Sequence, residues 1–205
     1  TSVWAIDTSG WINNGYPYLK CFGMKTISPT ITIEKILNGE TTLIFSNSGG
    51  ITLTTNRDGA TTPAYQTAAG QKLRTTDSRV LFDGSSNFTI MGWFRIDSFA
   101  DTYSYLFYKS GTGCNYGVVL SKSNDTPASF GAQISTPNGT SANSPYTGTV
   151  TTGKWIHVAM VYNDKKVTLY VNGVAQATSE AYAGSTGAGT EFYFGAFNGA
   201  MSDLK

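Results

Sequence analysis

The sequence predicts an all-β fold, a sandwich or barrel of short antiparallel strands. Of its 205 residues, 23 are glycine and 12 are tyrosine, a composition typical of many strands and tight turns. Short extended runs recur between turn signals, and we find no helical period longer than two turns. The most regular stretch, residues 153–177, alternates like strands joined by tight turns.

The first 40 residues are predicted to form a connector or capping segment with a small β or irregular structure. Their aromatic-rich start is interrupted by an Asn-Asn-Gly turn signal at 13–15. Asn38-Gly39 lies between extended runs in 31–45 and predicts a hairpin, because both residues tolerate positive φ. Residues 41–205 are then expected to make up one large β domain.

A series of short strands is expected within this domain. Residues 87–96 are representative, because Phe88, Ile90, Phe94 and Ile96 share one face of an extended run and predict that this face is buried. The other predicted strand segments are 51–56, 64–76, 103–110, 116–122, 129–135, 191–197 and 200–205. The polar stretch 136–153 is predicted to be a long loop.

Residues 155–178 are predicted to form three antiparallel strands. The run from Trp155 to Tyr162 is apolar on both alternating faces, so we expect it to be covered on both sides. A polar turn at 163–166 follows. Asn172-Gly173 then separates two further extended runs and is a strong signal for a two-residue hairpin turn.

The charge of the chain excludes partners that are recruited by a strong electrostatic field. It has 14 Lys and Arg against 13 Asp and Glu, so neither nucleic acid nor membrane insertion is expected. No apolar run approaches the ~18 residues of a membrane span. The Thr-, Gly- and Tyr-rich composition fits an extracellular, cell-surface or virion-surface location. Cys21 and Cys114 are interpreted as two partly buried thiols in preference to a disulfide.

Four segments occur in a characteristic order. They are NFTIMGWFRIDS, YLFYKSGTGCNYGVVLS, GKWIHVAMVYNDKKVTLYVNGVAQA and FYFGAFNGAMSDLK. Together they resemble the laminin G-like branch of the concanavalin A-like lectin/glucanase superfamily, over roughly residues 41–205. The resemblance implies a jelly-roll sandwich of two antiparallel sheets. It also implies an interior position for Trp155 and His157, so the chain's one histidine is predicted to be a core residue and not a catalytic one.

The two ends of the chain suggest that it belongs to a larger protein. The opening VWAIDTSGWINNGYPYLK resembles a short segment of large bacterial and phage surface proteins. At the other end, related domains continue past the Phe-Asn-Gly strand, whereas this sequence stops at Lys205. The chain is therefore interpreted as a piece of a modular or multimeric assembly.

Calcium is the one cofactor that the resemblance suggests. Sites in the superfamily use carboxylates and carbonyls near the last strand, and the candidates here are Asp97, Asp101 and Asp203. Ordinary solvated loop carboxylates are the favoured interpretation, because Ser202 stands where related domains often carry an acidic residue.

The superfamily also contains glycoside hydrolases, which share a strand with closely spaced acidic residues. In retaining enzymes the two catalytic carboxyl groups lie about 5 Å apart. None of the four glutamates here has a carboxylate partner two to four residues away: Glu34, Glu40, Glu180 and Glu191. We therefore expect no enzyme, and a glycoside hydrolase without the usual motif remains the second alternative.

A non-catalytic binding or adhesion module is the favoured function, with carbohydrate as the expected ligand. Sugar sites combine aromatic rings with Asn, Asp and backbone groups. The candidate ligand-binding residues are Tyr103, Tyr105, Asn115, Tyr116, Tyr146 and Tyr182, with Asn124 and Asp125 close by in sequence. For each tyrosine alone, strand-end packing is the competing interpretation.

A structural role is the first alternative. A low-charge sandwich would serve equally well as a decoration or spacer domain in a fibre, adhesin or virion. An aromatic patch covered by a neighbouring subunit would favour this role, whereas a hollow formed by loops would favour glycan. The expected partners are accordingly a cell-surface glycan or a surface protein.

Overall fold

The structure is a computed structural model of the chain, and its regular elements are almost entirely β-strands. Within the described part there is one single-turn 3₁₀ helix, Ser78–Val80, and no α-helix. None of the described residues builds a helix long and apolar enough to cross a membrane. The structure describes residues 4–6, 17–19, 26–27, 30–33, 43–59, 64–99, 103–111, 113–123, 126–136, 141–144, 149–184, 187 and 189–205.

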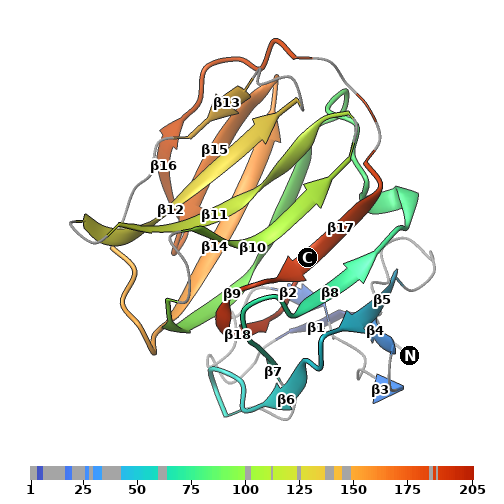
Figure 1. The fold of residues 1–205 in the computed structure, drawn as a ribbon, viewed down its shortest axis with the longest axis vertical. Helices are drawn as coiled ribbons and strands as arrows, with labels where there is room; N and C mark the ends of the chain where they lie inside the picture. Colours follow the sequence, from blue (N-terminus) through green and yellow to red (C-terminus); the bar gives the residue numbers. More distant parts are fainter. Residues whose placement is uncertain are drawn as a thin grey trace.

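The larger of two antiparallel sheets has nine strands (Figure 1). From edge to edge they are β13 (Ser141–Asn143), β12 (Thr126–Ser135), β11 (Asn115–Ser123), β10 (Tyr103–Ser110), β17 (Glu191–Gly195), β8 (Lys72–Thr75), β5 (Leu43–Ser48), β4 (Thr30–Ile33) and β3 (Thr26–Ile27).

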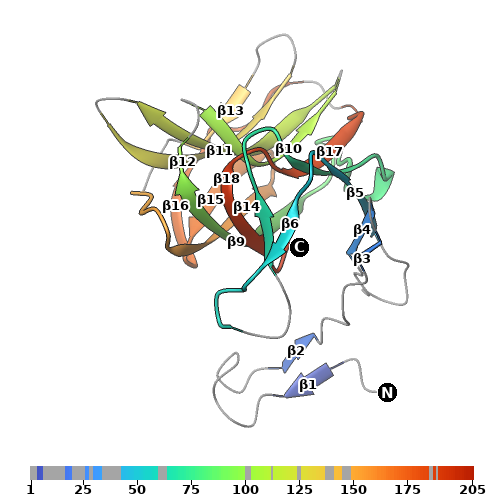
Figure 2. The same ribbon diagram turned by 60° about the horizontal axis from the view of Figure 1, so that its bottom comes forward.

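The second sheet has seven strands and lies behind the first in Figure 1. From edge to edge they are β16 (Val174–Thr178), β15 (Lys166–Val171), β14 (Trp155–Asn163), β9 (Phe88–Ser98), β18 (Asn198–Ser202), β7 (Ala64–Thr67) and β6 (Thr52–Thr54). A separate pair, β1 (Trp4–Ile6) and β2 (Pro17–Leu19), lies apart from both sheets (Figure 2). The predicted all-β sandwich of two antiparallel sheets is confirmed.

The core lies between the sheets because each strand turns one face inward. In β9 the predicted residues Phe88, Ile90, Phe94 and Ile96 are all buried. Strand β14, which pairs with β9, buries Ile156, Val158, Met160 and Tyr162 on the same inner face. Aromatic rings fill much of the space between the layers, which gives the sandwich a large apolar core.

The predicted turns around β15 are also confirmed. Asn163 pairs with Lys166, so Asp164 and Lys165 form a two-residue loop with φ values of 48° and 63°. The second loop, between β15 and β16, is Asn172-Gly173 with φ values of 50° and 78°. Positive φ at both positions is the type I′ geometry that matches the twist of paired strands.

Three local expectations differ from the structure. The predicted loop 136–153 contains β13, which pairs with β12 and so extends the nine-stranded sheet. Strand β14 is not covered on both faces as predicted: Trp155, His157 and Val161 on its outer face are partly exposed. Strand β4 lies within the predicted connector, residues 1–40, yet it pairs with β5 of the large sheet. The division of the chain at residue 40 stays a prediction.

Candidate functional site

A bulge in β10 brings two tyrosines to the outer face of the nine-stranded sheet. The pairing register between β10 and β11 shifts between Tyr105 and Phe107, so Leu106 is an extra residue in β10. In an uninterrupted strand Tyr105 and Tyr108, three residues apart, would point to opposite faces. Here both are partly exposed on the outer face, and their ring centroids are 4.4 Å apart.

Tyr108 stands in a row of residues that crosses six strands of this sheet. From β12 to β5 the paired residues are Gln133, Gly117, Tyr108, Tyr193, Arg74 and Ser46. The glycine leaves room for the Tyr108 ring, since a Cβ at Gly117 would lie 2.9 Å from Tyr108 Cδ2. The Tyr193 ring continues the row, 6.0 Å from Tyr108 between centroids, but it is only 6% exposed and so supports its neighbours from beneath the surface. We refer to Tyr105, Tyr108 and Tyr193 as the tyrosine strip.

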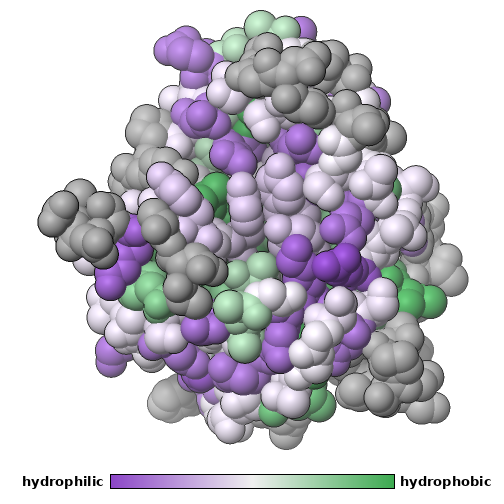
Figure 3. Space-filling view, viewed as in Figure 1, coloured by the Kyte–Doolittle hydropathy of each residue, from purple (hydrophilic) through white to green (hydrophobic). Residues whose placement is uncertain are grey.

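Strand β8 adds two cations beside the tyrosine strip. Its alternate residues are buried, which leaves Lys72 and Arg74 on the outer face. Lys72 Nζ lies 3.9 Å from the Tyr193 ring centroid, a cation–π contact. Arg74 Nη1 donates to Glu191 Oε2 at 3.2 Å. Figure 3 looks onto this face and shows a strongly hydrophilic cluster over β17 and β8.

Burial and charge alter the titration of these groups. Burial lowers the pKa of Lys72; the Arg74 charge lowers it further, and Glu191 acts in the opposite direction. Burial is also the largest cause that raises the pKa of Tyr108 and of Tyr193 above the usual phenol range. Both phenols therefore stay protonated at neutral pH and can donate a hydrogen bond.

Two polar atoms on this face are buried without a hydrogen-bond partner: Arg74 Nε and Asn115 Oδ1. Asn115 begins β11 two residues before Gly117, so its side chain leaves the sheet on the same side. A buried donor or acceptor without a partner costs free energy, and a bound hydroxyl or carboxylate can recover it. The face thus combines aromatic rings with unused hydrogen-bonding capacity.

Three of the predicted ligand-binding residues lie on this face. Tyr105 belongs to the tyrosine strip, and Tyr103, two residues earlier on β10, is 60% exposed. Asn115 lies on the neighbouring strand and supplies one of the two unpaired atoms. Tyr146 falls outside the described residues, as do Asn124 and Asp125.

For Tyr116 and Tyr182 the structure corrects the prediction. Tyr116 is fully buried, because it belongs to the inward-pointing residues of β11, and its hydroxyl donates to the Val80 carbonyl at 2.8 Å. Tyr182 is 2% exposed and is part of the same core. A ring enclosed by protein cannot stack on a sugar, so these two are scaffold residues.

Two of the three candidate calcium ligands, Asp97 and Asp203, lie in separate ion pairs. Arg95 Nε and Nη2 donate to the two carboxylate oxygens of Asp97, at 2.7 and 3.0 Å. These bonds are the main reason why the pKa of Asp97 is low. Asp203 pairs with Arg57, and Asp101 falls outside the described residues. No group of three or more His, Cys, Asp or Glu in the described part of the chain could hold a metal ion.

His157 lies on the outer face of the seven-stranded sheet, which corrects the prediction of an interior position. Its ring packs edge-on against Trp93 at 5.4 Å, and the Arg57 guanidinium covers the Trp93 ring at 4.6 Å. Burial lowers the pKa of His157, and the charges of Lys205 and Arg57 lower it further. The residue therefore packs on a surface, and its structural role stays a prediction.

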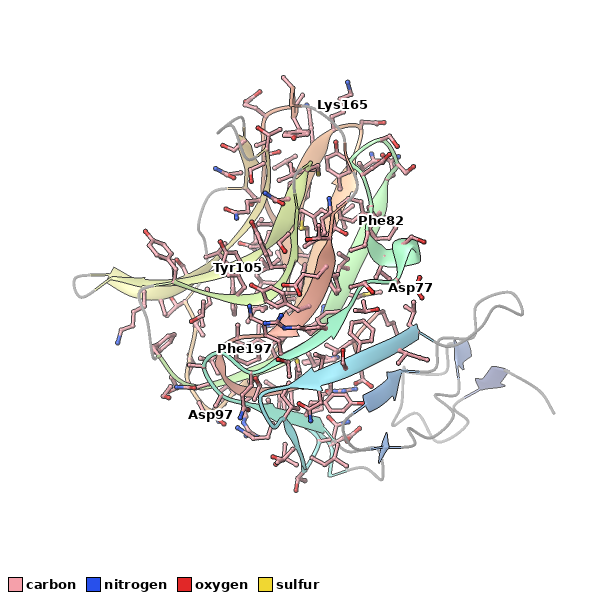
Figure 4. The ribbon with its side chains drawn as sticks, turned by 45° about the vertical axis from the view of Figure 1, so that its right-hand side comes forward. Asp77, Phe82, Asp97, Tyr105, Lys165 and Phe197 are labelled. Carbon is pink, nitrogen blue, oxygen red and sulfur yellow. The ribbon has the colours of Figure 1, made fainter. Side chains whose placement is uncertain are left out.

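Four residues of the outer face are not among the site residues predicted from the sequence: Lys72, Arg74, Tyr108 and Tyr193. Lys72 and Arg74 carried a usable signal, because they alternate with Leu73 and Thr75 in a strand pattern. Tyr193 carried the same kind of signal, because it alternates with Phe192 and Phe194 in the predicted strand 191–197. Tyr108 carried none, since the predicted strands gave no sign of the bulge that turns it outward. In Figure 4, Tyr105 and Asp97 are labelled: they come from β10 and β9, in different sheets.

Two antiparallel sheets that enclose an aromatic core, with a polar and aromatic outer face, define a lectin-type jelly-roll sandwich. A family model of this class, described as the concanavalin A-like lectin/glucanases superfamily in its laminin G-like form, matches residues 67–205. The chain therefore belongs to this family, as its sequence motifs predict. No curated protein matches the chain.

Solved structures with the same fold share little sequence with this chain. Domain 4 of AbnA, a GH43 extracellular arabinanase from Geobacillus stearothermophilus, in complex with arabinotriose, is 19% identical; the TM-score is 0.58, over 77% of this chain and 74% of that one. Trypanosoma rangeli sialidase with the inhibitor DANA is 13% identical, with a TM-score of 0.54 over 78% and 26%. Domains LG4-5 of the mouse laminin α1 chain are 11% identical, with a TM-score of 0.51 over 82% and 47%. These similarities show the fold alone, in enzymes and in a laminin chain.

Proposed function

We propose that this domain binds carbohydrate on the outer face of its nine-stranded sheet, with the partly exposed rings of the tyrosine strip, Tyr105 and Tyr108, as the platform. The observation that carries the proposal is the pair Tyr105 and Tyr108, whose partly exposed rings lie 4.4 Å apart on an otherwise polar face. Such rings pack against the C–H faces of sugars. The unpaired atoms of Asn115 and Arg74 provide an acceptor and a donor for sugar hydroxyls.

The proposed role is binding without catalysis. Glu191 is the one carboxylate on the described strands of this face, and Arg74 already engages it. Hydrolysis of a glycosidic bond by the usual route needs two carboxyl groups across one bond. The presence of arabinotriose with a domain of the same fold supports the choice of ligand class. In this proposal the domain serves adhesion in an extracellular or virion surface protein.

A glycan panel tests the proposal. The wild-type chain, Tyr105→Ala and Tyr108→Ala are compared on the same immobilised glycans. We expect each change to weaken binding by about fivefold, because stacking on one aromatic ring is worth roughly 1 kcal/mol. Tyr170→Ala is the matched control, since Tyr170 is partly exposed on β15 of the other sheet.

Two results would overturn the proposal. The first is a folded wild-type chain that binds no glycan on the panel, which would leave protein contacts as the better function. The second is an equal loss of binding in the Tyr170→Ala control, which would place the ligand elsewhere. Unfolding midpoints of all variants confirm that a loss of binding is not a loss of fold.

A further inference from the structure

The two cations of β8 lie next to each other on the outer face and share a single carboxylate. Lys72 and Arg74 are two residues apart, so both side chains leave the sheet on the same side. The Arg74 charge adds to burial in lowering the pKa of Lys72, which means that the cations repel one another. Glu191 neutralises one of the two charges. The described strands of this face therefore keep a net positive charge beside the tyrosine strip.

Arg74 has an unused hydrogen-bond donor in its guanidinium group. Nη1 donates to Glu191, whereas Nε has no partner. Nε and Nη2 form the edge that binds a carboxylate through two parallel hydrogen bonds. Nε itself is buried, whereas the side chain as a whole is 40% exposed, so a rotation of the side chain is needed to bring this edge to a ligand on the sheet. A carboxylate bound at this edge would satisfy Nε.

The position of the Lys72 ammonium is restricted by a cation–π contact with the Tyr193 ring. The ammonium contacts the face of Tyr193 and lies within ion-pair distance of no described carboxylate. The ring restricts where the ammonium can go, so its charge stays next to the tyrosine strip. An anionic group placed between Lys72 and Arg74 would remove their mutual repulsion and gain charge-assisted hydrogen bonds from both.

We propose that the ligand of this face is a glycan whose sugars carry carboxylates, with the uronate group between Lys72 and Arg74 and the sugar ring on Tyr105 and Tyr108. This inference rests on the carbohydrate-binding function proposed above. The two groups of residues have different roles: Tyr105 and Tyr108 contact the apolar face of the sugar, and the cations of β8 select for the acid. A neutral sugar would leave Arg74 Nε without a partner, and its binding is correspondingly weaker.

The test compares each acidic polymer with its own carboxyl-reduced form, which keeps the backbone and removes the charge. Polygalacturonate, alginate and hyaluronan serve as probes, together with neutral galactan and arabinan. We expect the wild-type chain to bind at least one acidic polymer about tenfold better than its reduced form, the value of one charge-assisted hydrogen bond. This preference should weaken with increasing salt.

Variants connect the preference to the two cations. Lys72→Gln and Arg74→Gln should bring the ratio of acidic to reduced binding close to one. Arg74→Lys keeps the positive charge but loses the paired donors of the guanidinium group, so an intermediate ratio of acidic to reduced binding is expected. Lys166→Gln is the control, because Lys166 is exposed on β15 in the other sheet; it should keep the wild-type ratio. Unfolding midpoints show that each variant is folded.

The possible outcomes distinguish a failure of the acidic-ligand inference from a failure of the proposed carbohydrate-binding function. Equal binding of acidic and reduced polymers, with loss in Tyr105→Ala, would overturn the acidic ligand and leave carbohydrate binding in place. A preference for acidic polymers that persists in both Gln variants would also overturn the inference. Binding of none of the polymers, acidic or neutral, would overturn both.

Discussion

His157 is expected to make the folded state less stable as the pH falls into the mildly acidic range. Its ring lies against Trp93, with Arg57 and Lys205 as neighbouring cations and Asp203 as the partner of Arg57. The pKa of the folded residue is below the 6.5 of the unfolded chain, so below that pH the unfolded state binds more protons. Stability is therefore present above pH 6.5 and is lost as the pH falls through the folded pKa.

The variant His157→Gln tests this residue directly. Urea unfolding at about pH 7.5 and about pH 5 should show a larger loss of stability for the wild-type chain than for the variant. The effect is modest, because the ring is partly exposed. A loss on acidification that is identical in both proteins would assign the pH dependence to other groups.

The burial of Lys109 could not be predicted from the alternation of residues in the sequence. It is fully buried, and its ammonium donates to the carbonyl oxygens of Cys114 and Gly187. Strict alternation along 103–110 would place Lys109 outside with Tyr103 and Tyr105. The extra residue Leu106 reverses the pattern and sends Lys109 inward while it sends Tyr108 outward. One bulge therefore explains both a missed site residue and an unexpected buried cation.

The elements with strong local signals were predictable, and those that depend on distant pairing were not. Strand β9 and the two turns around β15 follow from alternation and from the preference of Asn-Gly for positive φ. The row across the nine-stranded sheet requires β10 to pair with β17 and β17 with β8, which are far apart in the sequence. The local pattern gives no information on these pairings, and the family resemblance implies only the two-sheet sandwich that contains them.

The two type I′ turns allow a pair of opposite substitutions, for which we predict opposite changes in the free energy of unfolding. Lys165, labelled in Figure 4, has a φ of 63° in the first turn, and Gly173 has a φ of 78° at the same position of the second. Positive φ costs a residue with a Cβ roughly 1 kcal/mol. Lys165→Gly should raise the free energy of unfolding by about 0.5–1 kcal/mol, and Gly173→Lys should lower it by at least as much. Urea unfolding measures both; changes of the same sign would show that the turns do not control hairpin stability.

At the scale of the whole molecule, we predict that neither stability nor glycan binding depends on calcium. Asp97 and Asp203 would have to give up Arg95 and Arg57 to bind the ion, and calcium requires six to eight oxygen ligands. The unfolding midpoint and the glycan affinity should therefore be the same in millimolar calcium and in chelator. Asp97→Asn and Asp203→Asn should each cost up to about 1 kcal/mol, as expected for an exposed ion pair, in both solutions alike. A midpoint that rises with calcium, and that either variant returns to the chelator value, would contradict the prediction.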